Sequence, residues 1–183
     1  MFYLVRHGET QWNVDGVYQG WSNNPLNEKG FAQAEDISRE IAKLSPTAFY
    51  CSDLLRAKQT AEIINKNLGI KIIFDERLRE FSLGAYEGKS KLNIPTQELY
   101  KQEFGAETPK EVFKRAKSFT SELKEMNISD ALVVAHRGLI QMILYCIDKH
   151  KWNDEDSDTF FDAVFNKTPH TSIIKLDLNA TYC

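Results

Sequence analysis

The sequence predicts an α/β protein, arranged as a three-layer α/β/α sandwich around a mostly parallel central sheet. Short apolar runs alternate with amphipathic helical segments along the chain, and this alternation is typical of parallel sheets. Three of the apolar runs are apolar at every position, so both faces of those strands would be covered by helices. The 183 residues contain no internal repeat or linker-like tract, so a single domain over residues 1–183 is expected.

Five segments are expected to form strands. Residues 2–5 (FYLV), 48–51 (AFYC) and 131–135 (ALVVA) are apolar throughout and would lie inside the sheet. Residues 70–74 (IKIIF) form a further short apolar run. Residues 172–178 (SIIKLDL) alternate between apolar and polar positions, which indicates one exposed face, so this strand is expected at an edge of the sheet.

Two amphipathic helices are predicted in the first half of the chain. Apolar residues recur at helical spacing over residues 31–44, behind Asn27 as the expected cap. The same spacing is found over residues 54–68, with Ser52 as the expected cap. Gly69 would end this second helix, because glycine readily adopts the left-handed conformation found at helix C-termini.

Two further helices are predicted in the second half. Residues 108–111 (TPKE) form a capping box with proline at the first helical position, and apolar residues follow on one face as far as Met126. Residues 139–147 are apolar nearly all round, which is typical of a central helix packed on a sheet. These helices lie on either side of the predicted strand at 131–135, as the α/β assignment requires.

Two long stretches, residues 8–26 and 80–108, lack a clear period. Loops of this length in a compact domain are usually functional or disordered, and their aromatic content argues against disorder. We therefore expect lid-like loops over residues 8–26 and 85–108 that form the walls of a pocket. Three lysines of the second stretch either meet a second anionic group of a ligand or are simply solvated, and solvation is the default; they are Lys89, Lys91 and Lys101.

The composition excludes several function classes. The net charge of −3 argues against a nucleic-acid partner and against a basic membrane-binding surface. No apolar run approaches the roughly 20 residues of a membrane-spanning helix, and no basic stretch precedes the first apolar run, as a signal peptide would require. The cysteines (Cys51, Cys146 and Cys183) show no CxxC spacing and are expected to be reduced thiols. A cytoplasmic protein is therefore expected.

Charged and polar side chains follow the predicted strands at the points where the strands end. In a parallel sheet, ligands bind beyond the carboxyl ends of the strands, so these residues would share one edge. The set comprises Arg6, His7 and Gly8 after the first strand, Ser52, Asp53 and Arg56 after the second, Glu80 after the third, and His136, Arg137 and Gly138 after the fourth. Each alone is more often structural, but so many cations placed together require an anion as a partner.

A phosphate group fits this set of side chains. Arg56 lies one turn into a helix, so its side chain would lean back over the helix start, where free amides also attract anions. A phosphate could then sit between Arg6, Arg56 and the two imidazoles. No metal-ligand spacing is present, and His150 and His170 lack partners at such spacing, so no metal site is expected. Protein cations would take the place of magnesium.

Four motifs resemble, in order, the signatures of the histidine phosphatase superfamily, in the branch that contains cofactor-dependent phosphoglycerate mutases and many small phosphatases. They are RHGETQWN (6–13), SDLLRAKQTA (52–61), LREFSLGAYEG (78–88) and AHRGLI (135–140). Two further segments, YQGWSNNPLNEKG (18–30) and GAETPKEVFKR (105–115), are similar to other patterns of the family. The resemblance covers nearly the whole chain and implies a phosphoglycerate mutase-like fold.

The resemblance implies a role for each matching residue. His7 would be the nucleophile that takes the phosphoryl group as a phosphohistidine, and Glu80 would protonate the leaving oxygen and then deprotonate the attacking water. The catalytic residue His136 would hold the phosphoryl oxygens together with Arg6 and Arg56, with Asn13, Gln19 and Gly20 at the rim. No cofactor is implied. The family usually has glycine directly after the second histidine, whereas this chain has Arg137, whose side chain is expected to turn away into a salt bridge.

The motifs leave three functions open. The acid is followed by FSLGAYEG, which resembles the phosphatase type, and residues 89–108 are short for the lid of a mutase. A phosphatase acting on a small phosphorylated metabolite is therefore favoured. The alternatives are a cofactor-dependent phosphoglycerate mutase and a catalytically idle domain that binds a phosphorylated ligand. An idle domain would be expected to lack the nucleophile or the acid, and both are present.

Overall fold

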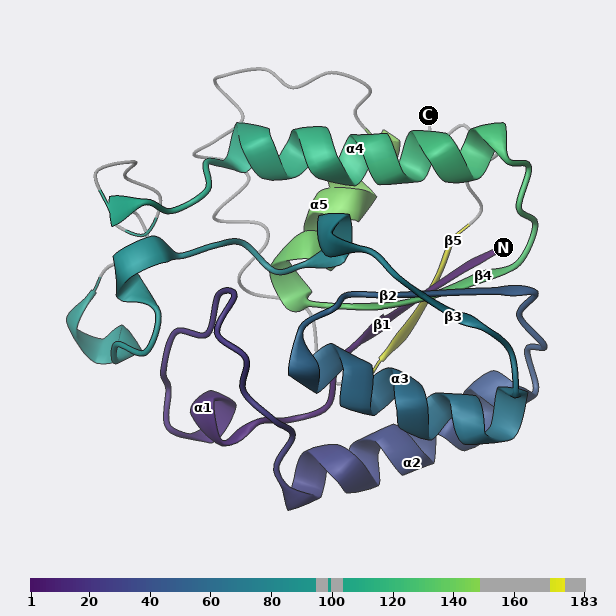
Figure 1. The fold of residues 1–183 in the computed structure, drawn as a ribbon, viewed down its shortest axis with the longest axis horizontal. Helices are drawn as coiled ribbons and strands as arrows, with labels where there is room; N and C mark the ends of the chain where they lie inside the picture. Colours follow the sequence, from purple (N-terminus) through teal and green to yellow (C-terminus); the bar gives the residue numbers. More distant parts are fainter. Residues whose placement is uncertain (95–98, 100–103, 149–171, 177–183) are drawn as a thin grey trace.

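The computed structural model describes residues 1–94, 99, 104–148 and 172–176 (Figure 1). Within these residues, the predicted alternation of strands and helices is confirmed. The sequence predictions that concern Lys101, His150, His170 and Cys183 lie outside the described residues. No helix among the described residues is long and apolar enough to cross a membrane.

Five strands form one mostly parallel sheet in the order β3-β2-β4-β1-β5. β4 (Ala131–Ala135) pairs in parallel with β1 (Phe2–Arg6) on one side and with β2 (Ala48–Cys51) on the other. β3 (Ile72–Phe74) extends the sheet beyond β2. β5 (Ile173–Leu176) runs antiparallel to β1 at the opposite edge, so the predicted edge strand is confirmed.

The register brings the carboxyl ends of three parallel strands to one place. β1 and β4 end at paired residues, Arg6 and Ala135. The ladder continues one residue further, since the His7 amide donates to the Ala135 carbonyl at 3.0 Å. The Ser52 amide, just beyond β2, likewise donates to the Val134 carbonyl at 2.9 Å. The first residues beyond β1, β2 and β4 therefore meet at one edge of the sheet.

Helices cover both faces of this sheet, as a three-layer sandwich requires (Figure 1). They are, on one face, α2 (Glu28–Ala42) and α3 (Leu55–Leu68) and, on the other face, α4 (Pro109–Glu125) and α5 (Arg137–Asp148). Successive strand residues point to opposite faces, so Val133 joins the core beneath α4 and α5, whereas Val134 joins the core beneath α2 and α3. This two-sided burial is the reason that the inner strands are apolar throughout.

Most helix ends follow the predicted signals. The Asn27 side-chain oxygen caps α2 by accepting from the Gly30 amide at 2.8 Å. Thr108 and Glu111 form the predicted capping box of α4, each side chain bonding to the other residue's backbone. Gly69 ends α3 in the left-handed conformation, with φ of 63°.

The predicted cap of α3 at Ser52 is wrong. The residue before α3 is Leu54, whose side chain makes no capping hydrogen bond. The Ser52 hydroxyl lies instead 2.8 Å from Nε2 of His136 and accepts only a long bond, 3.4 Å, from the Leu54 amide. A buried tertiary partner has therefore taken the hydroxyl that the local sequence assigned to the helix.

The two stretches without a clear period contain short helices joined by irregular backbone. These are α1 (Gln11–Val14) in the first stretch and the 3-10 helices η1 (Glu76–Leu78), η2 (Gly84–Tyr86) and η3 (Lys91–Asn93) around the second. The stretches bond to each other, because the Tyr18 amide donates to the Lys89 carbonyl and the Gly88 amide donates to the Tyr18 carbonyl, both at 2.9 Å. They therefore form one connected wall above the sheet edge.

Candidate active site

A cavity of about 570 Å³ collects most of the residues that the sequence singled out. Its wall includes Arg6, His7, Asn13, Gln19, Gly20, Arg56 and Glu80. These residues come from segments far apart in the sequence: the end of β1, α1 and the loop after it, the first turn of α3, and the segment after η1. Both aperiodic stretches contribute to the wall, Tyr18 from the first and Leu83 from the second.

His7 is held in one tautomer. Its Nδ1 lies 2.7 Å from the Gly8 carbonyl oxygen, and because a carbonyl can only accept, Nδ1 carries the proton. Nε2 therefore keeps its lone pair, and Nε of Arg56 donates to it at 3.3 Å. A neutral imidazole nitrogen with its lone pair beside a fixed cation is suited to attack an electrophile that carries negative charge.

Arg56 joins this imidazole to the loop after α1. The side chain is buried, with 1% of its surface exposed. Nη1 donates to the Ser22 carbonyl at 2.9 Å, and Nη2 donates to the Gly20 carbonyl at 2.8 Å. Burial lowers the pKa of Arg56 to about 10, so the guanidinium keeps its charge at neutral pH. A buried cation of this kind requires an anion or fixed dipoles around it, and here the loop carbonyls provide part of that environment.

His136 lies behind His7 and is fully buried, so it is not part of the cavity wall. The two ring centroids are 5.1 Å apart. Nε2 of His136 pairs with the Ser52 hydroxyl, and Nδ1 is buried with no hydrogen-bond partner among the described residues. Burial, together with the charge of Arg56, holds the pKa of His136 well below its usual range. The ring is therefore neutral at neutral pH.

The Glu80 carboxylate is fixed by three backbone amides, two of them at the start of α5. Oε1 accepts from the amides of Phe81 (3.0 Å) and Leu139 (3.2 Å), and Oε2 accepts from the amide of Gly138 (3.1 Å). A β-carbon at Gly138 would lie 2.5 Å from Oε1 of Glu80. This chain has its glycine at position 138, one residue later than the family usually does. The structure explains this position, because only glycine leaves space for the Glu80 carboxylate there.

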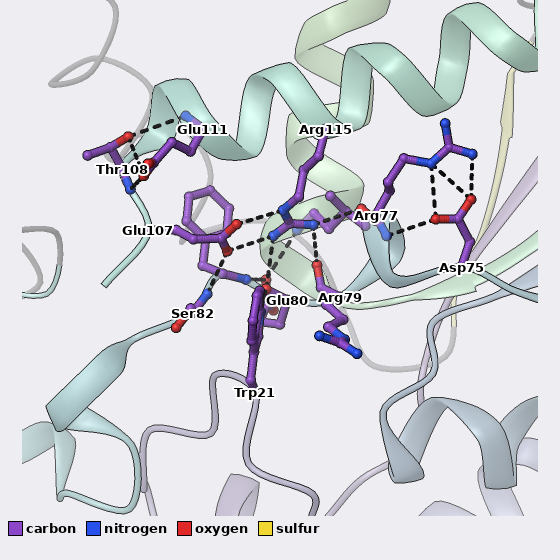
Figure 2. A network of polar contacts seen from close by, with 12 residues as sticks. Trp21, Asp75, Arg77, Arg79, Glu80, Ser82, Glu107, Thr108, Glu111 and Arg115 are labelled. Carbon is purple, nitrogen blue, oxygen red and sulfur yellow. Dashed lines mark hydrogen bonds and ion pairs between the residues drawn. The ribbon is translucent and has the colours of Figure 1, made fainter. Parts of the chain in front are cut away.

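Arg115 of α4 holds the backbone that carries Glu80 (Figure 2). Nη1 donates to the carbonyls of Arg77 (2.7 Å) and Arg79 (2.6 Å), and Nη2 donates to the carbonyl of Glu80 (2.9 Å). The guanidinium also forms a two-point ion pair with Glu107, at 2.9 and 3.0 Å. One side chain therefore fixes three backbone carbonyls of the segment that ends at the candidate acid.

Two residues lock the loops around this segment. The Trp21 indole donates to the Glu80 carbonyl at 2.6 Å (Figure 2). The Glu87 carboxylate accepts from the amides of Trp21 (2.8 Å) and Leu83 (3.2 Å) and from the Ser22 hydroxyl (2.9 Å). The first loop and the segment after Glu80 therefore hold each other in place at the cavity.

Asn13 and Gln19 both line the cavity, but only the side-chain oxygen of Asn13 accepts hydrogen bonds from the described residues. Oδ1 of Asn13 accepts from the amide and the hydroxyl of Thr10, both at 3.1 Å, so its amide nitrogen is the group that can donate to a ligand. Oε1 of Gln19 is buried and has no hydrogen-bond partner among the described residues. Both side chains thus offer polar atoms at the wall of the cavity.

Arg137 does not turn away from the cavity, contrary to the sequence prediction. It is part of the cavity wall. Its charge is also the largest electrostatic cause, after burial, of the lowered pKa of Arg6, which falls to about 10. Arg137 is the first residue of α5 and follows His136, the residue directly after β4. Arg137 therefore adds a cation to the site.

Sequence reasoning missed the residues that hold the site together. Arg115, Glu107 and Glu87 were not singled out, although all three are charged and anchor backbone next to Glu80. One signal was available, since the segment GAETPKEVFKR begins near Glu107 and ends at Arg115. Nothing in that segment indicates which backbone its arginine would reach.

The cavity combines an imidazole whose Nε2 is unprotonated, buried arginines and a fixed carboxylate, which are the groups needed to transfer an anionic group. Comparison with known proteins agrees with this chemistry. The chain matches the pattern of the histidine phosphatase superfamily (branch 1) over residues 2–163. It is 35% identical to a Hydrogenobacter thermophilus protein named "Putative phosphoserine phosphatase 2", in a match that covers 78% of this chain and 75% of the relative.

Two further matches are informative. The chain is 48% identical over 96 residues to "Probable phosphoglycerate mutase GpmB" of Salmonella choleraesuis, a match that spans 52% of this chain but 44% of that relative. The solved mycobacterial glucosyl-3-phosphoglycerate phosphatase, in complex with VO3, superposes with a TM-score of 0.73 and 28% identity over 82% of each chain. Because the family match runs through His7, Glu80 and His136, this chain belongs to branch 1 of the histidine phosphatase superfamily.

Proposed function

We propose that the chain is a metal-independent phosphomonoester hydrolase that acts on a small phosphorylated metabolite through a phosphohistidine on His7. The observation that carries the proposal is the tautomer of His7, whose Nδ1 proton is held by the Gly8 carbonyl while Nε2 keeps its lone pair beside Arg56. A general phosphate-binding site needs only cations. The fixed lone pair is an additional feature that a nucleophile requires.

In the first step, the lone pair of His7 Nε2 attacks phosphorus and the bond from phosphorus to the ester oxygen breaks. The protonated carboxyl of Glu80 gives its proton to the departing oxygen, which leaves as an alcohol. Arg6 and Arg56 stabilise the negative charge on the phosphoryl oxygens, because phosphoryl transfer depends mainly on positioning and electrostatics. The neutral His136, behind His7, offers Nδ1 as a further contact.

In the second step, water attacks the phosphohistidine. The Glu80 carboxylate takes a proton from the water as the oxygen–phosphorus bond forms, and the phosphorus–nitrogen bond breaks with its electron pair returning to Nε2 of His7. Inorganic phosphate leaves, and Glu80 is again protonated for the next cycle. Each step thus uses the same carboxyl in opposite directions, and three backbone amides keep that carboxyl in one position.

Positive charge for both steps would come from the protein, which is why we propose metal independence. Arg6 and Arg56 are buried in the wall beside His7. Among residues 1–94, 99, 104–148 and 172–176, no three His, Cys, Asp or Glu side chains group in a way that could hold a metal ion. Activity in the presence of a chelator is therefore the expected result.

A phosphatase activity is favoured over the mutase activity that also occurs in this branch of the family. The relative covered over 75% of its length carries a phosphoserine phosphatase name, and the superposed mycobacterial enzyme is a glucosyl-3-phosphoglycerate phosphatase. The second candidate is a phosphoglycerate mutase, supported by the 48% identity to GpmB over part of that protein. A mutase must keep water from its phosphoenzyme while the substrate reorients, so dependence on a bisphosphoglycerate primer separates the two.

We also propose that the substrate is a diffusible metabolite in the cytoplasm. The net charge of −3 disfavours a nucleic-acid partner or a basic membrane-binding surface. Cys51 and Cys146 are buried and unbridged, as expected in a reducing compartment.

The proposal is tested by measuring phosphate release from a panel of phosphomonoesters with a chelator present. The panel contains 3-phosphoglycerate, sugar phosphates and nucleotides, and wild type is compared with His7→Ala. Release by wild type that disappears in His7→Ala, together with loss of acid-labile phosphoenzyme labelling, is expected. A strict requirement for added magnesium, or undiminished labelling of His7→Ala with its circular dichroism unchanged, would refute the mechanism.

A further inference from the structure

The tautomer of His7 depends on the direction of one peptide group. The Gly8 carbonyl, 2.7 Å from Nδ1 of His7, is the acceptor that keeps the proton on this nitrogen. A trans peptide group is planar, so its C=O and its N–H point in opposite directions. If the group between Gly8 and Glu9 were turned over, an N–H would face Nδ1 and the proton would move to Nε2. The nitrogen beside Arg56 would then have no lone pair with which to attack.

Gln33 of α2 fixes the opposite side of this peptide group. Its side-chain oxygen, Oε1, accepts from the Glu9 amide at 2.9 Å. Because that N–H is directed towards α2, the C=O of the same group is directed away from α2 and towards the imidazole of His7. Gln33 is not part of the cavity wall, yet only one peptide group separates it from the proposed nucleophile.

The sequence places Gln33 and Gly30 on one face of α2, because residues three apart on a helix are neighbours. A β-carbon at Gly30 would lie 2.0 Å from the Glu9 carbonyl oxygen, and one at Gly8 would lie 2.4 Å from the Gly30 carbonyl oxygen. The Asn27 amide also donates to the Glu9 carbonyl at 3.0 Å. These contacts hold the chain close to α2, but none of them involves the C=O of Gly8 or the N–H of Glu9, so they do not set the direction of that group.

Thr60 of α3 holds the preceding peptide group. Its buried hydroxyl accepts from the Gly8 amide at 3.1 Å and donates to the Arg56 carbonyl at 2.8 Å. The backbone on the N-terminal side of Gly8 is therefore tied to the turn of α3 that carries Arg56. Glycine itself permits rotation at low steric cost, so the bond to Gln33 is what limits rotation on the C-terminal side.

We propose that Gln33 is a positioning residue that selects the reactive tautomer of His7 by holding the peptide group between Gly8 and Glu9 in one direction. The inference rests on the proposed phosphatase function, because the lone pair on Nε2 affects the rate only if this nitrogen attacks phosphorus. It gives a residue outside the cavity an effect on the first chemical step.

The tautomer is measured by nitrogen NMR of protein with labelled histidine, at a pH of about 9. This pH is well above the ordinary pKa of histidine, about 6.5, so a neutral ring is observed. Protonated and unprotonated ring nitrogens have well-separated chemical shifts, and His7→Ala identifies the signals of His7 among the four histidines of the chain. In parallel, kcat/KM is measured for p-nitrophenyl phosphate, whose phenolate leaves without a proton, so that the attack by His7 is tested.

Three variants are compared with wild type. Gln33→Met removes the acceptor and keeps the length of the side chain, whereas Gln33→Glu keeps an oxygen that can accept from the Glu9 amide. Gln59→Met is the matched control, because Gln59 is also a half-buried helical glutamine whose Oε1 accepts from a loop amide, that of Leu26, at 2.8 Å.

In wild type, Nδ1 of His7 should be protonated and Nε2 should not be. Gln33→Met should move a large part of the proton population to Nε2 and lower kcat/KM by about tenfold, equivalent to about 1.4 kcal/mol. Gln33→Glu and Gln59→Met should keep the wild-type tautomer and kcat/KM. If circular dichroism shows that Gln33→Met does not fold, Gln33→Asn takes its place, because the shorter side chain withdraws the oxygen from the Glu9 amide.

Several results would overturn the role of Gln33. They are an unchanged tautomer in Gln33→Met, an equal change in Gln59→Met, a Gln33→Glu spectrum like that of Gln33→Met, or an altered tautomer with unchanged kcat/KM. The NMR measurement needs no turnover, so the two proposals fail separately. If wild type hydrolyses no phosphomonoester, the hydrolase proposal fails, and the nitrogen spectra alone decide whether Gln33 sets the tautomer.

Discussion

Replacing Arg115 with methionine tests whether a residue outside the cavity positions Glu80, the proposed acid. The side chain bonds three backbone carbonyls, at residues 77, 79 and 80, and pairs with Glu107. Arg115 and Glu107 are 14% and 17% exposed, so the pair is mostly buried. Removing one partner of such a pair costs about 3–5 kcal/mol of folding free energy. Methionine keeps much of the length of the side chain but donates no hydrogen bond.

The catalytic effect should depend on the leaving group. A displacement of about 1 Å at a reacting group can lower the rate by about 10²-fold, and we expect this loss in kcat/KM for glycerol 3-phosphate. Its alkoxide leaves poorly without a proton from Glu80. p-Nitrophenyl phosphate releases a stable phenolate, so its kcat/KM should fall by less than about tenfold. Both values are measured below the unfolding temperature of the variant.

Arg77→Met is the control for general damage. The Arg77 guanidinium pairs with Asp75 and Glu122 at 2.6 and 2.7 Å, on the side of Arg115 that faces away from Glu80 (Figure 2). This variant should lose stability without changing the ratio of the two kcat/KM values. If Arg115→Met slows both substrates equally, or if Arg77→Met changes the ratio as much, Arg115 contributes to packing and does not position the acid.

Three other changes have definite expected results. Gly20→Ala should lower Tm, since φ is +50° there and the new β-carbon would lie 2.2 Å from Oε1 of Glu87. The left-handed backbone conformation alone costs about 1–3 kcal/mol for a residue other than glycine. An unchanged Tm would contradict this expectation. Gly138→Ala should displace the Glu80 carboxylate and lower kcat by about 10²-fold, whereas full activity would show that the carboxylate works elsewhere. The buried His136 has a pKa below its usual 6.5, so the unfolded chain binds a proton that the folded chain does not. The free energy of unfolding should therefore fall as pH decreases below about 6.5, by at most about 1.4 kcal/mol per pH unit. In chemical denaturation, His136→Asn should remove that slope, and an identical slope in the variant would refute the assignment.

Much of the fold could be predicted because local and tertiary signals agree. β2 and β4 have the predicted bounds, since strands buried on both faces are marked by hydrophobicity alone. The strand predicted from residue 70 begins at Ile72, because the amide and carbonyl of Ile70 bond to the Asn65 side chain at the end of α3. β1 reaches Arg6 because β4 pairs with it that far. Hydropathy could not predict a charged residue inside a strand.

The site could be predicted in outline for a different reason. Parallel strands bring their carboxyl ends together, so His7, Glu80 and His136 could be expected at one edge from order and spacing. The contacts that hold these three side chains in place could not be predicted from the sequence. Arg115 meets the Glu80 carbonyl across 35 residues, and Arg137 faces the cavity because of where α5 begins. Such contacts depend on the packed geometry of helices and loops, which no local pattern encodes.

The position of β1 also has a consequence for how the protein is made. β1 is the first strand to be synthesised, but both of its neighbours, β4 and β5, come from the second half of the chain. The His7 amide bonds to the carbonyl of Ala135. Pairing over so long a sequence separation is slow because the intervening chain must first be ordered. A nascent or truncated chain that ends before β4 therefore contains His7 and Glu80 but lacks the strands that pair with β1, so the candidate site can assemble only after β4 has been synthesised.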